Sequence, residues 1–285
     1  MDTESLFIPG KKKPDQPIEP QKKDLWLDPS LAFAPLTYGF KLDAAQGRFD
    51  LRYGKLQENA EKLREGECDI SMISPLDYAK KKETWQIIPN ICVASYSGVR
   101  HVQLYFKKGL NRISNIIISP GLTVETVLLK ILMQEKFQLS PEYTVISGDL
   151  DTMLAAGDAA LVTGDISLDY YASRRNRLDL NEEWLDLTGF PFVYAFWAGR
   201  ELTVSAEDIR SIYNSYTLGL KNLENIAKDY AREHSQTWDF YHDYLANNLS
   251  YTFNEKEKEG LNEFYHYAFF YGYIEFIPEL HFFGI

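Results

Sequence analysis

The segment spanning residues 52–102 limits what this chain can fold into, because helical and strand patterns alternate there without a break. A helical pattern ends at Gly66, and the apolar strand pattern after it ends at Ser74. Two more apolar strand patterns follow, and Arg100 lies just before the last of them. Ligands of open α/β sheets bind at the carboxyl ends of strands, where the strand order reverses. We therefore expect Ser74 and Arg100 to lie in a pocket.

The same alternation continues along most of the chain. Outside the opening segment, strand patterns occur at 25–33, 49–53, 115–119, 143–146, 159–163 and 192–197. Helical patterns begin at Pro35 and Ser205 and also occur at 124–136, 149–156, 167–173, 238–249 and 254–271. Only helices are expected after residue 205. This order predicts an α/β protein with C-terminal helices.

The charge and the apolar pattern exclude two classes of partner. The chain has 30 Lys and Arg against 41 Asp and Glu, a net charge of −11. Nucleic-acid binding needs a basic surface, so no nucleic-acid partner is predicted. A small anionic ligand is still compatible, because one arginine can dominate a pocket. No run of about 18 apolar residues is present, so no membrane span is predicted.

The two cysteines predict neither a metal site nor a disulfide framework. Cys68 and Cys92 each lie in an apolar strand pattern, which favours buried free thiols. The sequence has no CxxC pair and no HExxH motif, so no metal and no other cofactor is predicted. A phosphate loop, a dinucleotide fingerprint and a GxSxG elbow are also absent from the sequence.

Residues 1–24 have a different composition from the rest of the chain. They contain four Pro and five Lys with almost no apolar run. Such a segment cannot bury enough apolar surface to order itself, and we expect a disordered extension. It also lacks the apolar core of a signal peptide, so a cytoplasmic protein is expected.

Five polar positions near expected strand ends each allow two interpretations. Ser74 either faces a cleft or only caps a helix, and Thr123 either helps a helix N-terminus to bind an anion or is only its N-cap. Arg100 is either a carboxylate clamp or a surface charge. His101 is either a ligand contact or an ordinary strand residue. Asp165 is either a general base or a helix cap and hinge partner.

Several short motifs resemble one family, the menaquinone-biosynthesis chorismate dehydratases of the futalosine pathway. The motifs are PLTYG at 35–39, LREGECDI at 63–70, ISPLDY at 73–78, VRHV at 99–102, LLKIL at 128–132, DAALVTGD at 158–165, LTGFPFVYAFWA at 187–198 and EGLNEFY at 259–265. No single motif is decisive, but their order and spacing cover about residues 25–283.

This resemblance implies a fold and a division into lobes. The fold is the two-lobed periplasmic-binding-protein-like type II fold, in which a ligand occupies the cleft between the lobes. Residues 25–101 together with 198–285 are expected to form the first lobe, and residues 102–197 the second.

The resemblance also implies an activity and a set of contacts. Family members are lyases that remove water from chorismate without a cofactor and give 3-[(1-carboxyvinyl)oxy]benzoate. The elimination is carbanion-like, and the substrate's own carboxylate helps to take the proton, so the protein mainly holds the substrate in position. No catalytic base is identified. The expected substrate-binding residues are Ser74, Arg100, His101, Thr123, Gly164 and Asp165.

Three positions depart from the family pattern as the resemblance implies it. Ala32 stands where an Asn is expected, His101 where a Ser is expected, and Val124-Glu125 where a helix often opens with Thr-Ser. A non-catalytic protein of the same fold that binds a small carboxylate is therefore the alternative hypothesis.

Overall fold

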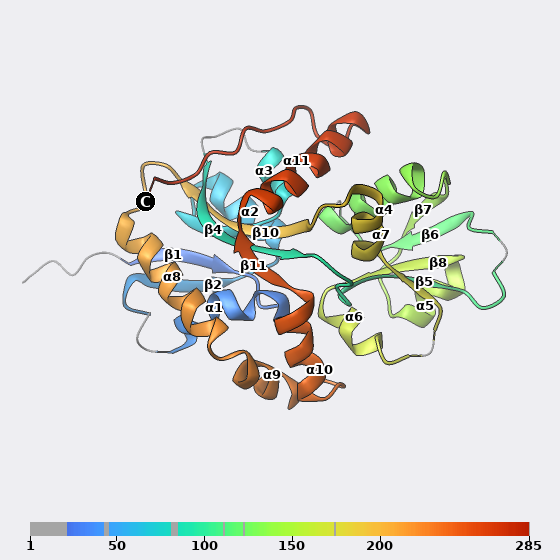
Figure 1. Ribbon diagram of the computed structural model, residues 1–285, viewed down its shortest axis with the longest axis horizontal. Coiled ribbons are helices and arrows are strands. Elements are labelled where there is room, and N and C mark those ends of the chain that lie inside the picture. Colours follow the sequence, from blue (N-terminus) through green and yellow to red (C-terminus); the bar gives the residue numbers. More distant parts are fainter. Residues whose placement is uncertain are drawn as a thin grey trace, which may run out of the picture.

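Two α/β lobes lie side by side, each built around its own sheet (Figure 1). The computed structural model describes residues 22–42, 46–80, 85–110, 112–121, 123–173 and 175–284. The extension expected at 1–24 lies outside this part of the chain except for its last three residues, of which Lys23 and Asp24 already belong to the first strand.

The first sheet has the strand order β11-β4-β10-β3-β1-β2. Its strands are β1 Lys23–Leu27, β2 Phe49–Tyr53, β3 Ile70–Ile73, β4 Trp85–Ser95, β10 Phe192–Arg200 and β11 Ser250–Phe253. Strand β1 pairs in parallel with β2 and β3, whereas β10 runs antiparallel between β3 and β4. The parallel strands therefore direct their carboxyl ends to one edge of this sheet.

The second sheet has the strand order β7-β6-β8-β5-β9. Its strands are β5 Val102–Phe106, β6 Asn115–Ile118, β7 Glu142–Val145, β8 Ala159–Thr163 and β9 Arg177–Asp179. Strand β6 pairs in parallel with β7 and β8, and β5 pairs antiparallel with β8. Two separate sheets with helices around them confirm the predicted α/β class.

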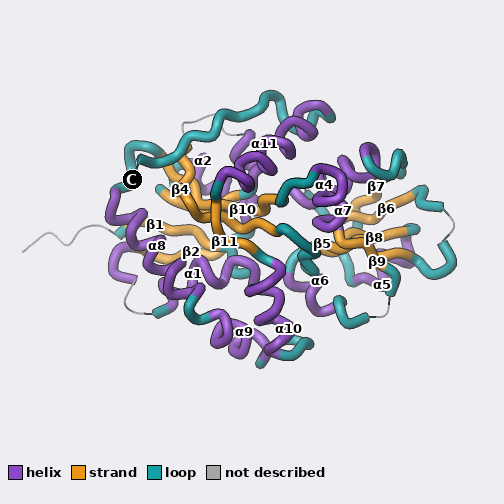
Figure 2. Tube along the Cα trace, viewed as in Figure 1, coloured by secondary structure: helices purple, strands orange, loops and turns teal. Residues whose placement is uncertain are grey.

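Helices flank both sheets (Figure 2). The α-helices are α1 Ala34–Lys41, α2 Leu56–Glu65, α3 Pro75–Ala79, α4 Val124–Glu135, α5 Leu150–Ala156, α6 Asp165–Tyr170, α7 Leu180–Thr188, α8 Ala206–Leu220, α9 Leu223–Ala231, α10 Trp238–Asp243 and α11 Glu255–Phe270. Short 3₁₀ turns form η1 Leu31–Phe33 and η2 Gln46–Arg48, and η3 Tyr244–Asn248 is a π-helix.

Local signals in the sequence explain several helix ends. Helix α2 ends at Gly66, which adopts a left-handed conformation with φ 76°, as glycine does at helix C-termini. Ser74 caps α3 by accepting a hydrogen bond from the Asp77 N–H. Ser205 and Asp208 form a reciprocal capping box at the start of α8.

Two short segments join the lobes. Strand β4 belongs to the first sheet and β5 to the second, so residues 96–101 pass between them. The chain returns through residues 189–191, between α7 and β10. The candidate site residues Arg100 and His101 therefore lie on the first connection.

The expected lobe boundaries stay a prediction, but the sheet pairing bears on one of them. Strand β10 pairs with β3 and β4 from Phe192 onward, so residues 192–197 lie in the first sheet. The boundary expected at 197 falls inside this strand. A boundary drawn by sheet membership lies before Phe192.

The first strand is shorter than the pattern at 25–33 predicted. Strand β1 ends at Leu27, and η1 follows at Leu31–Phe33. The Asp28 carboxylate accepts a hydrogen bond from the Ser30 N–H at 2.9 Å, a side-chain turn that ends extended structure. This turn brings Asp28 to the carboxyl end of β1.

The helix predicted at 238–249 is also interrupted. Helix α10 ends at Asp243, the π-helix η3 continues to Asn248, and the chain then forms β11. The sequence predicted no strand after residue 205. Strand β11 forms because it pairs with the edge of β4, a contact with a distant part of the chain that no local pattern reveals.

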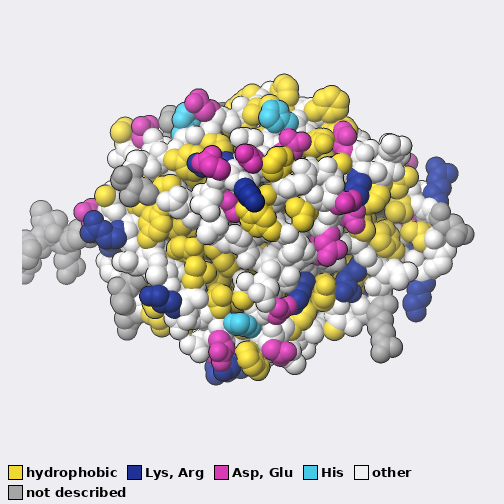
Figure 3. Space-filling view, viewed as in Figure 1, with side chains coloured by type: hydrophobic (Ala, Val, Ile, Leu, Met, Phe, Trp, Pro, Cys, Tyr) yellow, Lys and Arg dark blue, Asp and Glu magenta, His cyan; other side chains and the backbone are white. Residues whose placement is uncertain are grey.

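Other features of the described residues agree with the sequence analysis. Cys68 and Cys92 are buried free thiols, as predicted. Within these residues no helix is both long and apolar enough to cross a membrane. On the face drawn in Figure 3, Lys and Arg side chains are scattered among acidic and apolar ones.

Candidate functional site

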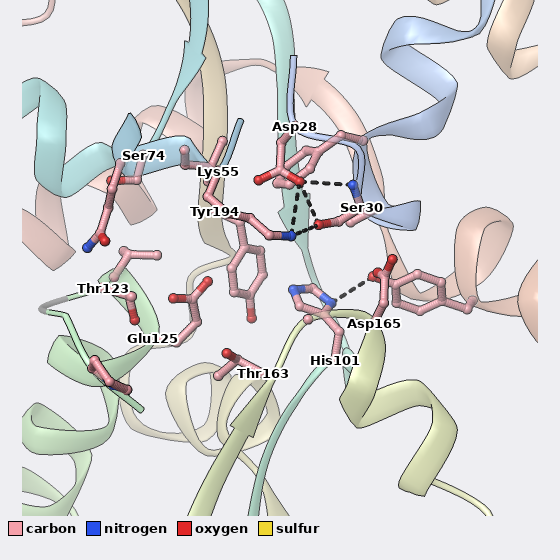
Figure 4. A pocket seen from close by; sticks show the side chains of 18 residues that line it. Asp28, Ser30, Lys55, Ser74, His101, Thr123, Glu125, Thr163, Asp165 and Tyr194 are labelled. Atoms are coloured by element: carbon pink, nitrogen blue, oxygen red, sulfur yellow. Dashed lines mark hydrogen bonds and ion pairs between the residues drawn. The ribbon is translucent and has the colours of Figure 1, made fainter. Parts of the chain in front are cut away.

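A cavity of about 310 Å³ lies at the carboxyl ends of strands from both sheets. Residues that follow β1, β3 and β8 line it, together with the N-terminal ends of α2 and α4 (Figure 4). Tyr194 of β10 and Tyr244 of η3 complete the wall. This position matches the place where open α/β sheets bind ligands.

Five of the six predicted site residues meet at this cavity. Ser74, His101, Thr123, Gly164 and Asp165 all line it. They come from four elements that are far apart in the sequence, so the two sheets bring them together.

Arg100 does not line the cavity. Its guanidinium forms an ion pair with Asp243 and donates to the Phe240 carbonyl at 3.2 Å. It also lies 4.8 Å from the centre of the Phe240 ring, a cation–π contact. Arg100 has a left-handed backbone with φ 57°, and the adjacent His101 faces the cavity instead.

The Ser74 hydroxyl both caps a helix and lines the cavity. Its Oγ accepts a hydrogen bond from the Asp77 N–H at 3.2 Å and donates to the Asp77 carboxylate at 2.6 Å. The hydroxyl proton is therefore already engaged, and Ser74 offers a ligand mainly its oxygen lone pair. Burial raises the pKa of Asp77, although the hydrogen bond from Ser74 opposes that rise.

Thr123 and Glu125 stand at the start of α4. Thr123 is the N-cap and accepts the Thr126 N–H at 3.2 Å, so the interpretation as a cap and the position in the cavity both hold. Glu125 is half-buried and lines the cavity. Burial raises the pKa of Glu125, the hydrogen bond from Thr123 opposes the rise, and the negative charges of Asp28 and Asp77 add to it.

Asp165 joins the two lobes across the cavity. It is the first residue of α6, and both carboxylate oxygens lie 3.1 Å from the Leu31 N–H at the start of η1. Burial raises the pKa of Asp165, while the Leu31 hydrogen bond acts in the opposite direction. Gly164, the residue before it, has φ 72° and ψ −157°, a conformation that is essentially restricted to glycine.

His101 is a neutral imidazole inside the cavity wall. Its side chain is buried, and burial lowers the pKa of His101 from 6.5 to about 4. The Nδ1 atom lies 2.8 Å from the Tyr244 hydroxyl and 3.2 Å from the Val99 carbonyl oxygen. At neutral pH His101 therefore contributes a neutral donor or acceptor to the cavity.

Lys55 supplies an amino group to the lining of this cavity, and the sequence did not predict it as a site residue. The Lys55 Nζ donates to the Ser30 hydroxyl at 2.9 Å and lies 3.7 Å from the Asp28 carboxylate (Figure 4). Its side chain is 72% exposed, so it is free to reach a ligand. The available signal was its place directly before the helical pattern at 56–65, within the segment 52–102.

The cavity carries more acidic than basic groups. The lining includes the carboxylates of Asp28, Glu125 and Asp165 but one amino group, that of Lys55, which lies beside Asp28. The lining also includes the aromatic rings of Phe33 and Tyr194. Within the described ranges, no group of three or more His, Cys, Asp or Glu side chains is placed to hold a metal ion. The aromatic rings suit an apolar ring of an organic ligand, and Lys55 suits an acidic group on it.

Comparison with known sequences links the chain to menaquinone biosynthesis. A family model described as menaquinone biosynthesis matches residues 29–269. A chorismate dehydratase of Thermus thermophilus is 26% identical over 220 residues, which cover 71% of this chain and 80% of that protein.

Comparison with solved structures shows the fold. A protein of Archaeoglobus fulgidus superposes with a TM-score of 0.70 at 18% identity, covering 89% of this chain and 98% of the other. The alkanesulfonate-binding protein SsuA of Xanthomonas axonopodis pv. citri superposes with a TM-score of 0.64 at 16% identity, covering 92% and 96%. A Candida albicans protein with the generic periplasmic-binding-protein fold gives 0.61 at 10% identity, covering 86% and 90%.

These structures confirm the predicted two-lobed periplasmic-binding-protein-like type II fold. The family match spans nearly the whole described chain, from the turn after β1 to the end of α11. This protein therefore belongs to the menaquinone-biosynthesis family.

Proposed function

We propose that this protein is a chorismate dehydratase, a hydro-lyase that converts chorismate to 3-[(1-carboxyvinyl)oxy]benzoate and water. The observation that carries the proposal is the cavity itself, where five residues expected from the family resemblance meet. Family membership and the Thermus thermophilus dehydratase support it. We further propose that the reaction needs no cofactor, serves the futalosine pathway and takes place in the cytoplasm.

The proposed substrate brings two carboxylates into the cavity. Lys55 supplies a cation at one side, and the positive end of the helix dipole at the start of α4, next to Thr123, favours an anion at the other. The rings of Phe33 and Tyr194 offer apolar contact to the six-membered ring of the substrate. The main task of the protein is then to hold the reacting groups in position.

The elimination removes a proton and a hydroxyl from neighbouring ring carbons and leaves an aromatic ring. The family resemblance implies that a carboxylate of the substrate takes the ring proton. The leaving hydroxyl needs a proton as well, and a protonated Glu125 or Asp165 can donate it. Burial raises the pKa of both groups, which increases their protonated fraction at a given pH.

A direct test is incubation of the purified protein with chorismate. We expect formation of the aromatic product, seen by ultraviolet absorbance and as a loss of one water by mass spectrometry. The product should form equally well with a metal chelator present. Unchanged chorismate after prolonged incubation with folded protein would reject the proposed reaction.

One observation favours the alternative of a non-catalytic carboxylate-binding protein. Ala32 lines the cavity and offers it no polar group, where the family resemblance implies an Asn. If chorismate binds by calorimetry but is not converted, this alternative is supported. The variant Ala32→Asn then tests whether the missing Asn explains the absence of turnover. A gain of turnover in this variant would show that it does.

A further inference from the structure

We propose that His101 contacts the bound ligand through Nε2–H, as a neutral hydrogen-bond donor, and that Tyr244 sets this tautomer. The ligand atom that accepts the bond is an oxygen of a carboxylate, and this identity rests on the proposed function. His101 would then be a ligand-contacting residue and Tyr244 a positioning residue.

The hydrogen bonds around Nδ1 select the tautomer. The Tyr244 hydroxyl lies 2.8 Å from Nδ1 and has no other hydrogen-bond partner within the described ranges. The Val99 carbonyl accepts the backbone N–H of His101 at 2.6 Å, so it does not depend on the ring for a donor, although it lies 3.2 Å from Nδ1. If the Tyr244 hydroxyl donates to Nδ1, both groups are satisfied, whereas a proton on Nδ1 would leave a buried hydroxyl without an acceptor. The ring proton therefore resides on Nε2.

The ring orientation presents Nε2 to the cavity. Figure 4 shows this second ring nitrogen on the side that faces Tyr194 and Glu125, away from the bond to Tyr244. The rings of His101 and Tyr194 pack edge to face with centres 4.7 Å apart, and the His101 ring packs in the same way on Tyr244 at 5.7 Å. The imidazole is therefore clamped between two tyrosines in one orientation.

The backbone that carries His101 is strained and held from several sides. Arg100 has φ 57°, and the bond from the His101 N–H to the Val99 carbonyl closes a tight turn around it. The Asp179 carboxylate accepts the Val99 and Arg100 N–H groups at 2.9 and 3.0 Å. Residues in such conformations persist where surrounding contacts enforce them, and they cluster at ligand sites.

The element that carries Tyr244 is unusual as well. Tyr244 begins the π-helix η3, directly after α10. Single π-helical turns within helices occur frequently at functional sites. Two independent backbone irregularities, at Arg100 and at Tyr244, thus meet at the hydrogen bond between His101 and Tyr244.

Burial, and not the surrounding charge, makes the ring a neutral donor. Asp28, Glu125 and Asp165 line the same cavity as His101, and the Lys55 amino group lies 3.7 Å from the Asp28 carboxylate. An imidazolium would pair with these carboxylates, but burial keeps His101 neutral at pH 7. A neutral Nε2–H leaves the donor available to the ligand.

The tautomer can be measured without any ligand. Histidine ring ¹⁵N chemical shifts distinguish a protonated from an unprotonated nitrogen, and the spectrum of His101→Gln identifies the His101 signals. We expect protonated Nε2 and unprotonated Nδ1. Tyr244→Phe should shift the proton towards Nδ1, which can then donate to the Val99 carbonyl. Protonated Nδ1 in the unmodified protein would overturn the inference.

A matched variant controls for the loss of a buried hydroxyl. Tyr251 is buried, and its hydroxyl has no hydrogen-bond partner among the described residues. Tyr251→Phe should leave the His101 tautomer unchanged. If Tyr251→Phe altered it as much as Tyr244→Phe, the specific role of Tyr244 would be refuted.

The ligand contact is tested with chorismate and benzoate as probes. Either carboxylate should shift the His101 Nε2–H signal of the unmodified protein. Chorismate affinity should fall about tenfold in His101→Leu, about 1.4 kcal/mol, and less in His101→Gln, whose amide can donate from a similar position. If neither probe moves the signal, the contact is refuted. If the signal moves but chorismate is not converted, only the proposed reaction fails.

Discussion

At the scale of single residues, burial determines the protonation of the acids that face the cavity. It raises the pKa of Glu125 and of Asp165, and neighbouring carboxylates add to the rise at both. A bound dianion favours the protonated form of each acid further, because the neutral carboxyl does not repel it and can donate a hydrogen bond. Ligand binding and proton uptake should therefore be coupled at this site.

This coupling predicts the pH dependence of Glu125→Gln. In the unmodified protein, chorismate affinity should fall as pH rises through the elevated pKa of Glu125, because the protonated form that favours binding is lost. Glutamine stays neutral and should flatten that part of the profile. Calorimetric titrations between about pH 5 and 8 measure the difference.

The exposed Glu142 provides a control for the same change of net charge. Glu142→Gln should keep the pH profile of the unmodified protein. A profile that flattens equally in both variants would show that overall charge, and not the Glu125 side chain, controls binding.

A second prediction concerns the backbone at Gly164. A Cβ atom added to Gly164 would meet no atom within 4 Å, so there is space for a side chain. The backbone, however, has φ 72° and ψ −157°. Gly164→Ala should therefore lower the free energy of unfolding by about 1–3 kcal/mol through backbone strain alone. Urea denaturation measures this loss. Gly47 also meets no atom within 4 Å and has no positive φ, so Gly47→Ala should be nearly neutral.

At the scale of elements, the connection between β4 and β5 carries one side chain that packs on a helix and one that lines the cavity. Arg100 points to α10 and pairs with Asp243, while His101 points into the cavity. The Ser167 hydroxyl of α6 donates to the Arg100 carbonyl at 2.9 Å. Contacts with α6 of one lobe and α10 of the other thus hold the connection. The Arg100 side chain packs on a helix, whereas the adjacent His101 side chain lines the cavity.

From this placement we predict a structural effect of Arg100→Ala. The variant loses a contact with the Phe240 ring, a hydrogen bond to the Phe240 carbonyl and a partly exposed ion pair. We expect the free energy of unfolding to fall by about 1–2 kcal/mol, with little of this from the ion pair, because Asp243 is 45% exposed. Urea denaturation of Arg100→Ala, Asp243→Ala and the double variant measures the coupling free energy between the two side chains.

Chorismate binding separates this role from that of a carboxylate clamp. Arg100→Ala should bind chorismate less than tenfold more weakly, because the guanidinium does not line the cavity. A loss of a hundredfold or more with an intact fold would place Arg100 at the ligand after all.

At the scale of the whole molecule, the larger of two apolar clusters among the described residues extends through both lobes. The smaller cluster, which includes Tyr105 and Ile117, lies within the second lobe. The larger cluster includes Ile70 and Ile91 of the first sheet together with Leu104 and Ile116 of the second. Trp184 of α7 contributes to this cluster by packing on Phe192 of β10, with ring centres 5.4 Å apart. The apolar surfaces of the lobes are therefore buried against each other as well as within each lobe.

An apolar cluster shared by both lobes predicts cooperative unfolding. The chain should unfold in one transition, because the larger apolar cluster includes residues of both lobes and loses part of its buried surface when either lobe opens. Far-ultraviolet circular dichroism and tryptophan fluorescence should give coincident urea curves. Two separated transitions would show that the lobes are independently stable.

Local patterns in the sequence determined most elements of this fold. The helix at 56–65 and the strands at 49–53, 102–106 and 159–163 have the predicted bounds, because apolar period, glycine and cap residues act over a few positions. The order of the motifs was sufficient to predict the fold and the family. Of the six site residues named from the sequence, five line one cavity in the structure.

Tertiary structure alone decided the direction of individual side chains and the contacts between distant segments. Arg100 turns away from the cavity because its backbone is left-handed and its partner Asp243 lies 143 residues further along the chain. Tyr244 reaches His101 over the same separation, and β11 forms only by pairing with β4. Such pairings depend on packing between elements, and no periodicity in the sequence encodes them.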